Sequence, residues 1–416
     1  MNLPEDFIRE TRLVMGEERL NRFLGAFDEE APTSIRLNPR KTSLTPHPSP
    51  LTTNPVPWCQ EGFYLQGRPQ FTFDPLFHAG CYYVQEAASM FVTHILRTLL
   101  TSPSSLLTPH SSLSALDMCA APGGKSTALR TVLPEGSLLV CNEPIANRAQ
   151  ILLENITKWG WPDCIVTNNY PRDFCKSRAT FDLILCDVPC SGEGMFRRDP
   201  ATIGEWSLQN VEKCWRLQRE IVADAWECLN PGGILIYSTC TFNTKEDEEN
   251  IRWILETYDA EALEIPTDPS WNITGSLLQG FEAPVYRFIP GITRSEGLFV
   301  CALKKRGRWS DYRGVRSVEC GVRNVIKKVQ GLKVISFHIP PSTFHTELTY
   351  PEALKYLRGE ALVLPADTPR GIVNVTYRGI ALGPVKNIGN RANNLYPKAW
   401  RIKTTHLPTE ALEVLV

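Results

Sequence analysis

The chain has 416 residues, of which 43% are hydrophobic and 21% charged, so it is long enough for two or three globular domains. The first residues, MNLPEDFIRETRL, are acidic and lack the cationic end and apolar stretch of a secretory signal. No apolar run approaches the roughly 18 residues of a membrane span. The net charge of −1 excludes a uniformly basic protein, and we expect a cytoplasmic location without membrane contact.

The predicted elements begin between residues 113 and 305, where strand-like and helix-like segments alternate. Strands are predicted at 114–120, 136–143, 163–169, 181–189 and 234–242. Helices are predicted at 125–133, 148–160, 210–229 and 245–258. Continuous apolar strands separated by amphipathic helices predict an α/β core whose parallel sheet is covered on both faces. A hairpin over 285–305 is expected to add edge strands.

The chain changes character after residue 305. Strand-like pieces at 333–340, 361–366 and 371–386, with one helix-like piece at 350–360, predict a small, mostly β domain. From residue 301 onward 19 Lys and Arg stand against 8 Asp and Glu, a net +11, whereas the first 300 residues have 25 against 37, a net −12. Such asymmetry is typical of a module that meets nucleic acid, although an accident of surface composition gives the same count.

Two low-complexity segments, 42–57 and 101–114, are rich in Ser, Thr and Pro. Proline restricts the backbone and the short polar side chains have little to bury, so these segments are predicted to be exposed loops.

The stretch DMCAAPGGKST (117–127) joins the first predicted strand to the first helix. It is neither a P-loop, because Cys119 stands where that motif needs glycine, nor GxGxxG. A tight turn of small residues here leads into a helix amino terminus, a geometry that lets a ligand approach backbone N–H groups closely. The segment consists of Cys119, Ala120, Ala121, Pro122, Gly123, Gly124 and Lys125. The next strand ends in Glu143, which is placed to bind the ribose hydroxyls of a nucleoside. These features favour S-adenosylmethionine (SAM) over NAD, with an ordinary strand-to-helix turn as the alternative.

Two further strands each end beside a cysteine. DLILCDVPCSGEGMFRRDP leads to Cys190, and GGILIYSTCTFN leads to Cys240. Carbon-5 of a pyrimidine becomes nucleophilic when a thiolate adds to carbon-6, and a second acid–base group helps the product to leave. Two cysteines with Asp187 and Lys125 therefore predict methylation of a pyrimidine carbon, since an amino-methylating enzyme would have an Asn/Asp-Pro-Pro-aromatic turn.

The other cysteines give no sign of a metal or redox site. The chain has 13 cysteines but no CxxC, which argues against a zinc ribbon and against a dithiol redox protein. Most of them lie in apolar runs and are expected to be small buried hydrophobes. We therefore expect no metal.

The stretches ALDMCAAPGGKSTAL, DLILCDVPCSGEGMFRRDP and GGILIYSTCTFNTKEDEENI resemble the signature motifs of the Nop/Sun family of RNA cytosine-C5 methyltransferases. The layout is most similar to the bacterial RsmF-like branch, which acts on ribosomal RNA. The resemblance covers about 83–305, and weaker matches are TSIRLNPRKT to the amino-terminal module and LGPVKNIGNRANNLYPKAW to a PUA-like module.

The resemblance implies a Rossmann-like, SAM-dependent methyltransferase core over 79–305. It also implies a small α+β, RNA-contacting module over 1–78 and a basic, PUA-like RNA-binding domain over 306–416. By this similarity the segment Cys119–Lys125, Glu143 and Asp187 would bind SAM, Cys240 would be the nucleophile, and Cys190 would release the product. The expected partner is ribosomal RNA or a ribosomal subunit, bound by a monomer.

Alternative functions stay open. The same chemistry on tRNA is compatible with the sequence. A non-catalytic RNA-binding or ribosome-assembly factor is a different class, but it should have lost a cysteine or the SAM turn. DNA cytosine methyltransferases attack through a Pro-Cys resembling Pro189-Cys190, so the two cysteine roles could be reversed.

One position departs from the family pattern, and two charged segments need separate interpretation. The family usually has an aspartate near the adenine where Tyr170 stands, and Asn168 or Asn169 is a candidate to replace it. Arg197 and Arg198 either contact phosphate or face solvent. The acidic run 247–249 is predicted to be a solvated helix start, favoured by the helix dipole.

Overall fold

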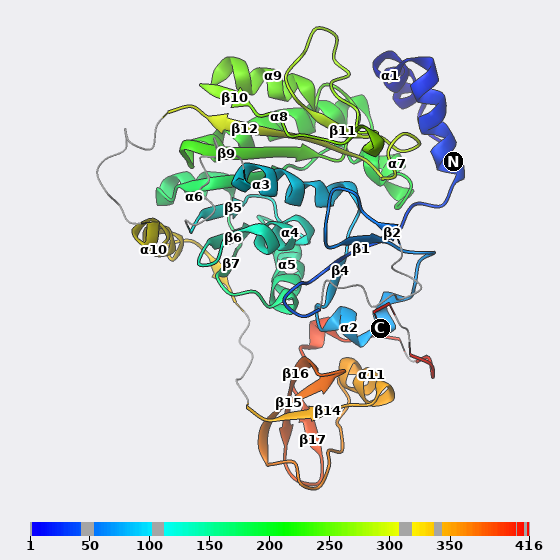
Figure 1. The fold of residues 1–416 in the computed structure, drawn as a ribbon, viewed down its shortest axis with the longest axis vertical. Helices are drawn as coiled ribbons and strands as arrows, with labels where there is room; N and C mark the ends of the chain where they lie inside the picture. The colour runs from blue at the N-terminus through cyan, green and yellow to red at the C-terminus, as the bar shows by residue number, and fades with distance from the viewer. Residues whose placement is uncertain are drawn as a thin grey trace.

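The computed structural model describes residues 2–42, 54–101, 112–307, 318–336, 343–404, 406–411 and 414–415. Figure 1 shows three parts: a large central sheet with its helices, an amino-terminal part beside it, and a carboxy-terminal lobe. Most of the two predicted loops, 42–57 and 101–114, lies outside the described residues.

Five parallel strands form the middle of the central sheet. They are β9 (Leu229–Thr239), β8 (Phe181–Asp187), β5 (Ser114–Asp117), β6 (Leu138–Asn142) and β7 (Cys164–Thr167), in this spatial order. On one side β12 (Leu298–Lys305) pairs antiparallel with β9, and β10 (Ala260–Ala262) and β11 (Tyr286–Phe288) pair with β12. The predicted α/β core and the edge hairpin are confirmed.

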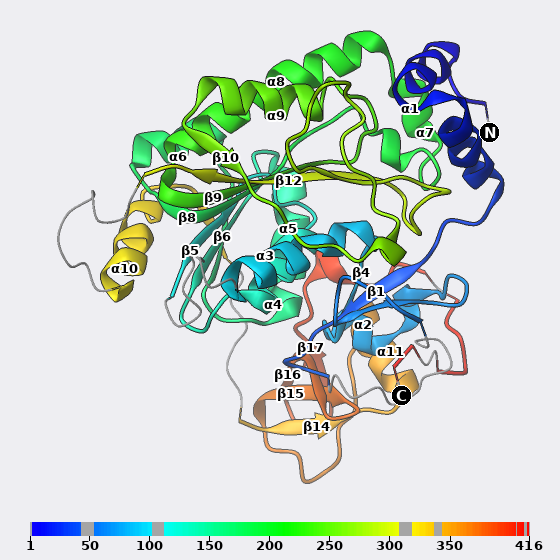
Figure 2. The ribbon, with the colours of Figure 1, turned by 45° about the horizontal axis from the view of Figure 1, so that its top comes forward.

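Helices cover both faces of this sheet, which explains why its strands are apolar throughout. One face carries α3 (Phe91–Thr101), α4 (Gly124–Val132) and α5 (Ala146–Trp159). The other carries α6 (Pro171–Ser177), α8 (Leu208–Glu227) and α9 (Glu248–Thr257), and Figure 2 shows α8 and α9 opposite α3 and α4. The Ser207 side chain caps α8 by accepting from the Asn210 N–H at 3.1 Å.

The central sheet takes a further strand from beyond residue 305. After α10 (Val318–Val329), β13 (Val334–Ile335) pairs antiparallel with β7. The sequence analysis grouped 333–340 with the carboxy-terminal strands, because strand periodicity does not reveal which open edge a strand will join. The predicted strand at 361–366 is wrong: Leu362 makes only an isolated bridge to Ala392.

The amino-terminal part consists of a kinked helix and an antiparallel sheet. The kinked helix is α1 (Glu5–Gly25), and a second, short helix, α2 (Pro75–His78), follows later in the chain. The sheet order is β2 (Asn54–Pro55), β3 (Gly62–Tyr64), β1 (Ser34–Leu37) and β4 (Tyr82–Val84), so its last strand lies beyond residue 78.

The carboxy-terminal lobe packs on the amino-terminal part. It contains α11 (Tyr350–Arg358) and a sheet of β14 (His345–Glu347), β15 (Gly371–Tyr377), β16 (Ile380–Asn387) and β17 (Ala392–Asn394). One apolar cluster spans both parts, and the Tyr350 hydroxyl donates to the Phe73 carbonyl at 3.1 Å.

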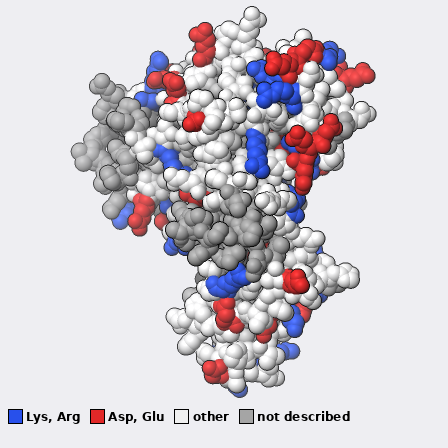
Figure 3. Space-filling view, turned by 45° about the vertical axis from the view of Figure 1, so that its right-hand side comes forward, with Lys and Arg blue, Asp and Glu red and all other residues white. Residues whose placement is uncertain are grey.

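The basic excess does not lie mainly in this lobe. Residues 301–342 contain 10 Lys and Arg against 2 acidic residues, whereas 343–416 contain 9 against 6. Figure 3 shows side chains of both signs on the lower lobe. The prediction of a basic carboxy-terminal domain therefore applies mostly to the segment that precedes its sheet. Across the described ranges, no helix combines the length and apolarity needed to cross a membrane.

Candidate active site

The two cysteines meet at the carboxyl edge of the sheet. β8 ends at Asp187 and β9 at Thr239, and their parallel register pairs Asp187 with Ser238. Cys190 follows β8 after a short turn and Cys240 follows β9 directly, so the Sγ atoms of Cys190 and Cys240 lie 3.1 Å apart. The predicted pairing of the two thiols is therefore present in the structure.

Lys125 and Asp187 form an ion pair beside the thiols. Lys125 Nζ lies 2.8 Å from Asp187 Oδ2, and the Ser238 hydroxyl donates to Asp187 Oδ1 at 2.7 Å. Burial lowers the pKa of Lys125, but the negative charge of Asp187 has the larger effect, so the pKa of Lys125 is raised above its usual value. Lys125 is therefore a cation at neutral pH, held at the amino-terminal end of α4.

Cys190 lies in an environment that favours its protonated form. Its hydrogen bond with Cys240, followed by burial, raises the pKa of the Cys190 thiol well above its usual value. Cys190 can therefore donate its S–H to the Cys240 sulfur. Burial also raises the pKa of Cys141, Cys186 and Cys301, which lie in the core as inert thiols, as predicted.

Two buried glutamates fix the two cysteine turns against each other. Glu246, which follows Cys240, accepts from the N–H and hydroxyl of Ser191, next to Cys190, at 3.0 and 2.5 Å. Glu193, which follows Cys190, accepts from the N–H groups of Phe242 and Asn243 at 2.6 and 3.1 Å. Each turn thus supplies a carboxylate that binds the backbone of the other. We call Glu193 and Glu246 the crossed carboxylates; the sequence analysis missed them.

The acidic run 247–249 is not a solvated helix start, so that prediction is wrong. Asp247 and Glu248 are fully buried, and Arg287 from β11 lies 3.0 Å from Asp247 and forms an ion pair with Glu248. Asp247 also accepts from the hydroxyl of Thr239, the last residue of β9, at 2.6 Å. The buried arginine supplies the counter-charge that makes this burial possible.

Helix α1 packs on both cysteine turns. The Phe7 ring lies 5.1 Å from that of Phe196, which follows Cys190, and the Phe23 ring lies 4.9 Å from that of Phe242, which follows Cys240. The amino-terminal helix therefore braces the site through aromatic contacts.

The turn after β5 fits SAM through two unsatisfied buried oxygens. Glu143 is 1% exposed, and its Oε1 accepts from the Ile145 N–H; its Oε2 accepts no hydrogen bond, and the Arg148 guanidinium lies 3.7 Å from it. Asp117 Oδ1 is likewise buried without a partner, and Asp117 was not among the predicted contacts. Two acceptors of this kind suit the hydroxyl and ammonium groups of SAM.

The predicted turn residues Cys119, Ala120, Ala121, Pro122, Gly123, Gly124 and Lys125 all lie between these two carboxylates along the chain. Gly123 has a φ of +112°, and a Cβ there would lie 3.2 Å from Leu152. The glycine is therefore required by the backbone and by packing on α5, in addition to any ligand approach.

Asn168 and Asn169, the candidates to replace the usual aspartate, both form hydrogen bonds within the chain. The Asn169 side chain exchanges hydrogen bonds with the backbone of Lys333 at 3.0 and 3.2 Å. The Asn168 amide donates to the Glu143 and Pro144 carbonyls and accepts from Lys333 Nζ. Both side chains hold β13 to this edge of the sheet.

The two arginines after Cys190 have different environments. Arg197 pairs with Glu296 at 2.9 Å, and its side chain is only 7% exposed, so the alternative that it faces solvent is wrong. Arg198 is exposed and pairs with no carboxylate of a described residue.

A doubly covered parallel sheet with this cofactor turn at its carboxyl edge defines a SAM-dependent methyltransferase. Three protein-family models match successive segments: the N-terminal domain of 16S rRNA methyltransferase RsmF (3–87), 16S rRNA methyltransferase RsmB/F (104–304) and the methyltransferase RsmF PUA domain (343–402). The chain belongs to the RsmB/F family of methyltransferases, with the amino-terminal and PUA domains of the RsmF type.

Individual relatives agree with this assignment. The ribosomal RNA small subunit methyltransferase F of Pectobacterium atrosepticum is 33% identical over 74% of this chain, a match that spans 63% of that protein. The protein of the same name from Enterobacter sp. (strain 638) is 28% identical over 95% of both chains.

Solved structures share the fold. A methyltransferase homologue from Pyrococcus horikoshii has a TM-score of 0.60 and 26% identity over 73% of this chain and 95% of its own. NSun6 from the same organism, solved with SFG, has a TM-score of 0.59 and 19% identity over 73% and 99%.

Proposed function

We propose that this chain transfers the methyl group of SAM to carbon-5 of a cytosine in small-subunit ribosomal RNA, through a covalent bond between Cys240 and carbon-6. The distance of 3.1 Å between the Cys190 and Cys240 sulfurs carries this proposal. The names of the relatives support ribosomal RNA as the substrate. Since one chain supplies every side chain of the site, we propose a monomer, acting in the cytoplasm.

The Cys240 thiolate begins the reaction. It forms the S–C6 bond, and the electron pair of the C5=C6 bond makes carbon-5 nucleophilic. Bound SAM supplies the electrophilic methyl group. Carbon-5 then carries both a methyl group and a proton; loss of the proton restores the C5=C6 bond and expels the Cys240 thiolate.

Cys190 becomes available as a base after Cys240 has attacked carbon-6. Its pKa is raised first by the hydrogen bond with Cys240. Once Cys240 is bonded to carbon-6 its charge is lost, so this cause disappears and the Cys190 thiol releases its proton to water more easily. A deprotonated Cys190 can then take the carbon-5 proton.

Asp187 recognises the cytosine base, and Lys125 compensates the negative charge of the site. A carboxylate accepts from the exocyclic amine of cytosine, which uracil lacks, so Asp187 can select the base. Lys125, 2.8 Å away, compensates the charge of that carboxylate and of the nearby thiolate. The cytosine must leave its stack to reach this edge.

Denaturing electrophoresis with RNA from a deletion strain tests the cysteine roles. Cys190→Ala should methylate and then remain as a protein–RNA band, because release fails. Cys240→Ala should form no band and no product, and Cys214→Ala, on α8 outside the pair, should behave as the parent chain. A band with Cys240→Ala instead would assign the attack to Cys190, and the absence of a band in both would contradict the covalent route.

Bisulfite sequencing of ribosomal RNA and tRNA from the same strain tests the substrate. Loss of one methylcytosine from small-subunit ribosomal RNA is expected. Loss from tRNA would redirect the activity, and no loss would favour a non-catalytic assembly factor.

A further inference from the structure

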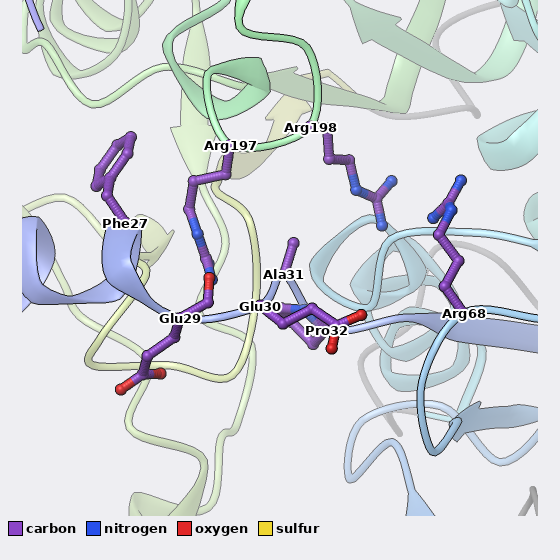
Figure 4. Close-up of a pocket in the computed structure, with 8 residues that line it drawn as sticks. All are labelled: Phe27, Glu29, Glu30, Ala31, Pro32, Arg68, Arg197 and Arg198. Atoms are coloured by element: carbon purple, nitrogen blue, oxygen red, sulfur yellow. The ribbon is translucent and has the colours of Figure 1, made fainter. Parts of the chain in front are cut away.

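A cavity of about 400 Å³ separates the amino-terminal part from the loop that follows Cys190. Its lining combines apolar and charged side chains, namely Phe27, Glu29, Glu30, Ala31, Pro32, Arg68, Arg197 and Arg198 (Figure 4). The three arginines come from two different parts of the chain, so the cavity exists only when those parts are assembled.

Arg197 forms a fixed wall of this cavity. Its Nη1 lies 2.9 Å from Glu296, and its Nη2 donates to the Glu29 carbonyl at 3.2 Å. Glu296 in turn has its N–H bound by Glu86 at 3.1 Å. Since Arg197 is paired and its side chain is 7% exposed, it holds the loop in place and is not itself available to a ligand.

Arg198 and Arg68 differ from Arg197. Both are exposed, and neither has a carboxylate within 4.0 Å among the described residues. Figure 4 shows their guanidinium groups directed toward the same space; the Glu30 carboxylate lies on the same side of the cavity, whereas the Glu29 carboxylate points away. Two like charges directed toward one space repel each other, and an anion placed between them would remove that repulsion.

We propose that Arg68 and Arg198 together bind one backbone phosphate of the RNA beside the target cytidine. The planar guanidinium fork matches a phosphodiester better than an ammonium does. The loop also leads directly to the reacting atoms: the Gly194 N–H donates to the Cys240 carbonyl at 2.7 Å, and Arg198 follows four residues later. This inference rests on the proposed function, because it takes the RNA at the cysteine pair as the ligand.

The proximity to the cysteines favours RNA over an acidic peptide. Cys190 and Arg198 lie eight residues apart on one loop, so a strand whose target base lies beside Cys190 and Cys240 would continue along the loop that carries Arg198. The pair Arg68 and Arg198, which we call the phosphate clamp, would therefore fix the RNA strand where the base turns out of its stack. Its contribution to RNA binding would be independent of nucleotide sequence.

Fluorescence anisotropy with a short single-stranded RNA of mixed sequence tests the phosphate clamp in the full chain. Arg68→Ala and Arg198→Ala should each weaken binding about fivefold, and the double variant by less than the product, because both act on one phosphate. The salt dependence of log K should lose about 0.7 for that single phosphate. Arg216→Ala is the matched control, since Arg216 is 69% exposed on α8 and, among the described residues, pairs only with Glu212.

A double variant that binds RNA and responds to salt as Arg216→Ala does would overturn the proposal. Strictly multiplicative losses would also overturn it, because they indicate two separate contacts. SAM affinity, measured by calorimetry, should stay within about twofold for every variant. Failure of the proposed function would appear separately, as absence of methylation by the unaltered chain.

Discussion

Replacing Glu246 by glutamine tests whether the crossed carboxylates set the position of the two sulfurs. Glu246 Oε2 accepts from the Ser191 N–H and from Gln218 Nε2, and its Oε1 accepts from the Ser191 hydroxyl and from Asn243 Nδ2. An amide has the same shape but replaces one acceptor by a donor. At the Oε2 position the new N–H₂ group would face two donors, so the glutamine should place it at Oε1.

In that orientation one hydrogen bond is lost. The Ser191 hydroxyl can turn to accept, but Asn243 Nδ2 cannot, because its amide also serves Glu193 at 2.9 Å. Above pH 7, where Glu246 is ionised, a buried bond to this charged group contributes about 2 kcal/mol. If the strain falls on the sulfur positions and hence on the transition state, this corresponds to about a 30-fold lower kcat, with little change in KM.

Single-turnover methylation measures the rate, and oxidation measures the geometry directly. Sulfurs 3.1 Å apart should form a disulfide readily with a mild oxidant, so peptide mapping should show slower Cys190–Cys240 crosslinking in Glu246→Gln. Glu249→Gln is the control, because its carboxylate accepts no hydrogen bond from any described residue. Lower stability with an unchanged kcat and an unchanged crosslinking rate would refute the reasoning.

Two further predictions concern charge and the cofactor. Burial raises the pKa of Asp117 and of Glu246 to about 7, so the folded chain binds more protons than the unfolded chain between about pH 4 and 7. The free energy of unfolding, measured in urea, should therefore fall as pH rises through this interval, less steeply in Glu246→Gln; a rise would contradict it. Glu143→Gln should weaken SAM binding about tenfold in calorimetry, because an amide replaces a carboxylate whose Oε2 is left free to accept from the ligand. The exposed Glu135→Gln is the control, and equal SAM affinities of the two variants would argue against ribose binding by Glu143.

The central sheet and the cysteine pair could be predicted from sequence because both follow from local patterns. Each strand is a short apolar run between turn signals, and ligands of such sheets bind at the carboxyl ends of the strands. Cys190 and Cys240 each follow a strand end, so adjacency of β8 and β9 was enough to bring them together. Their identification needed no long-range information beyond strand order.

The environment of the acidic residues could not be predicted in the same way. Asp247 and Glu248 have the sequence of an exposed helix start, and their counter-charge, Arg287, is about 40 residues away on β11. Arg197 also has a distant counter-charge, because its partner Glu296 lies 99 residues further along the chain. No local signal distinguishes a charged side chain that has a distant buried partner from one that faces solvent.

The same long-range pairing shows that the amino-terminal part belongs to the active site. Arg36 on β1 is fully buried, and it donates to the Gly124 carbonyl at 3.2 Å and to the Thr127 hydroxyl at 2.5 Å, at the start of α4. Burial lowers its pKa to about 10, so it remains charged at neutral pH. A core cut at residue 79 would lose this cation and leave the first turn of α4, which carries Lys125, without those donors. Because Arg36 binds the start of α4 and α1 packs on both cysteine turns, the amino-terminal part supports the cofactor turn and the cysteine pair together.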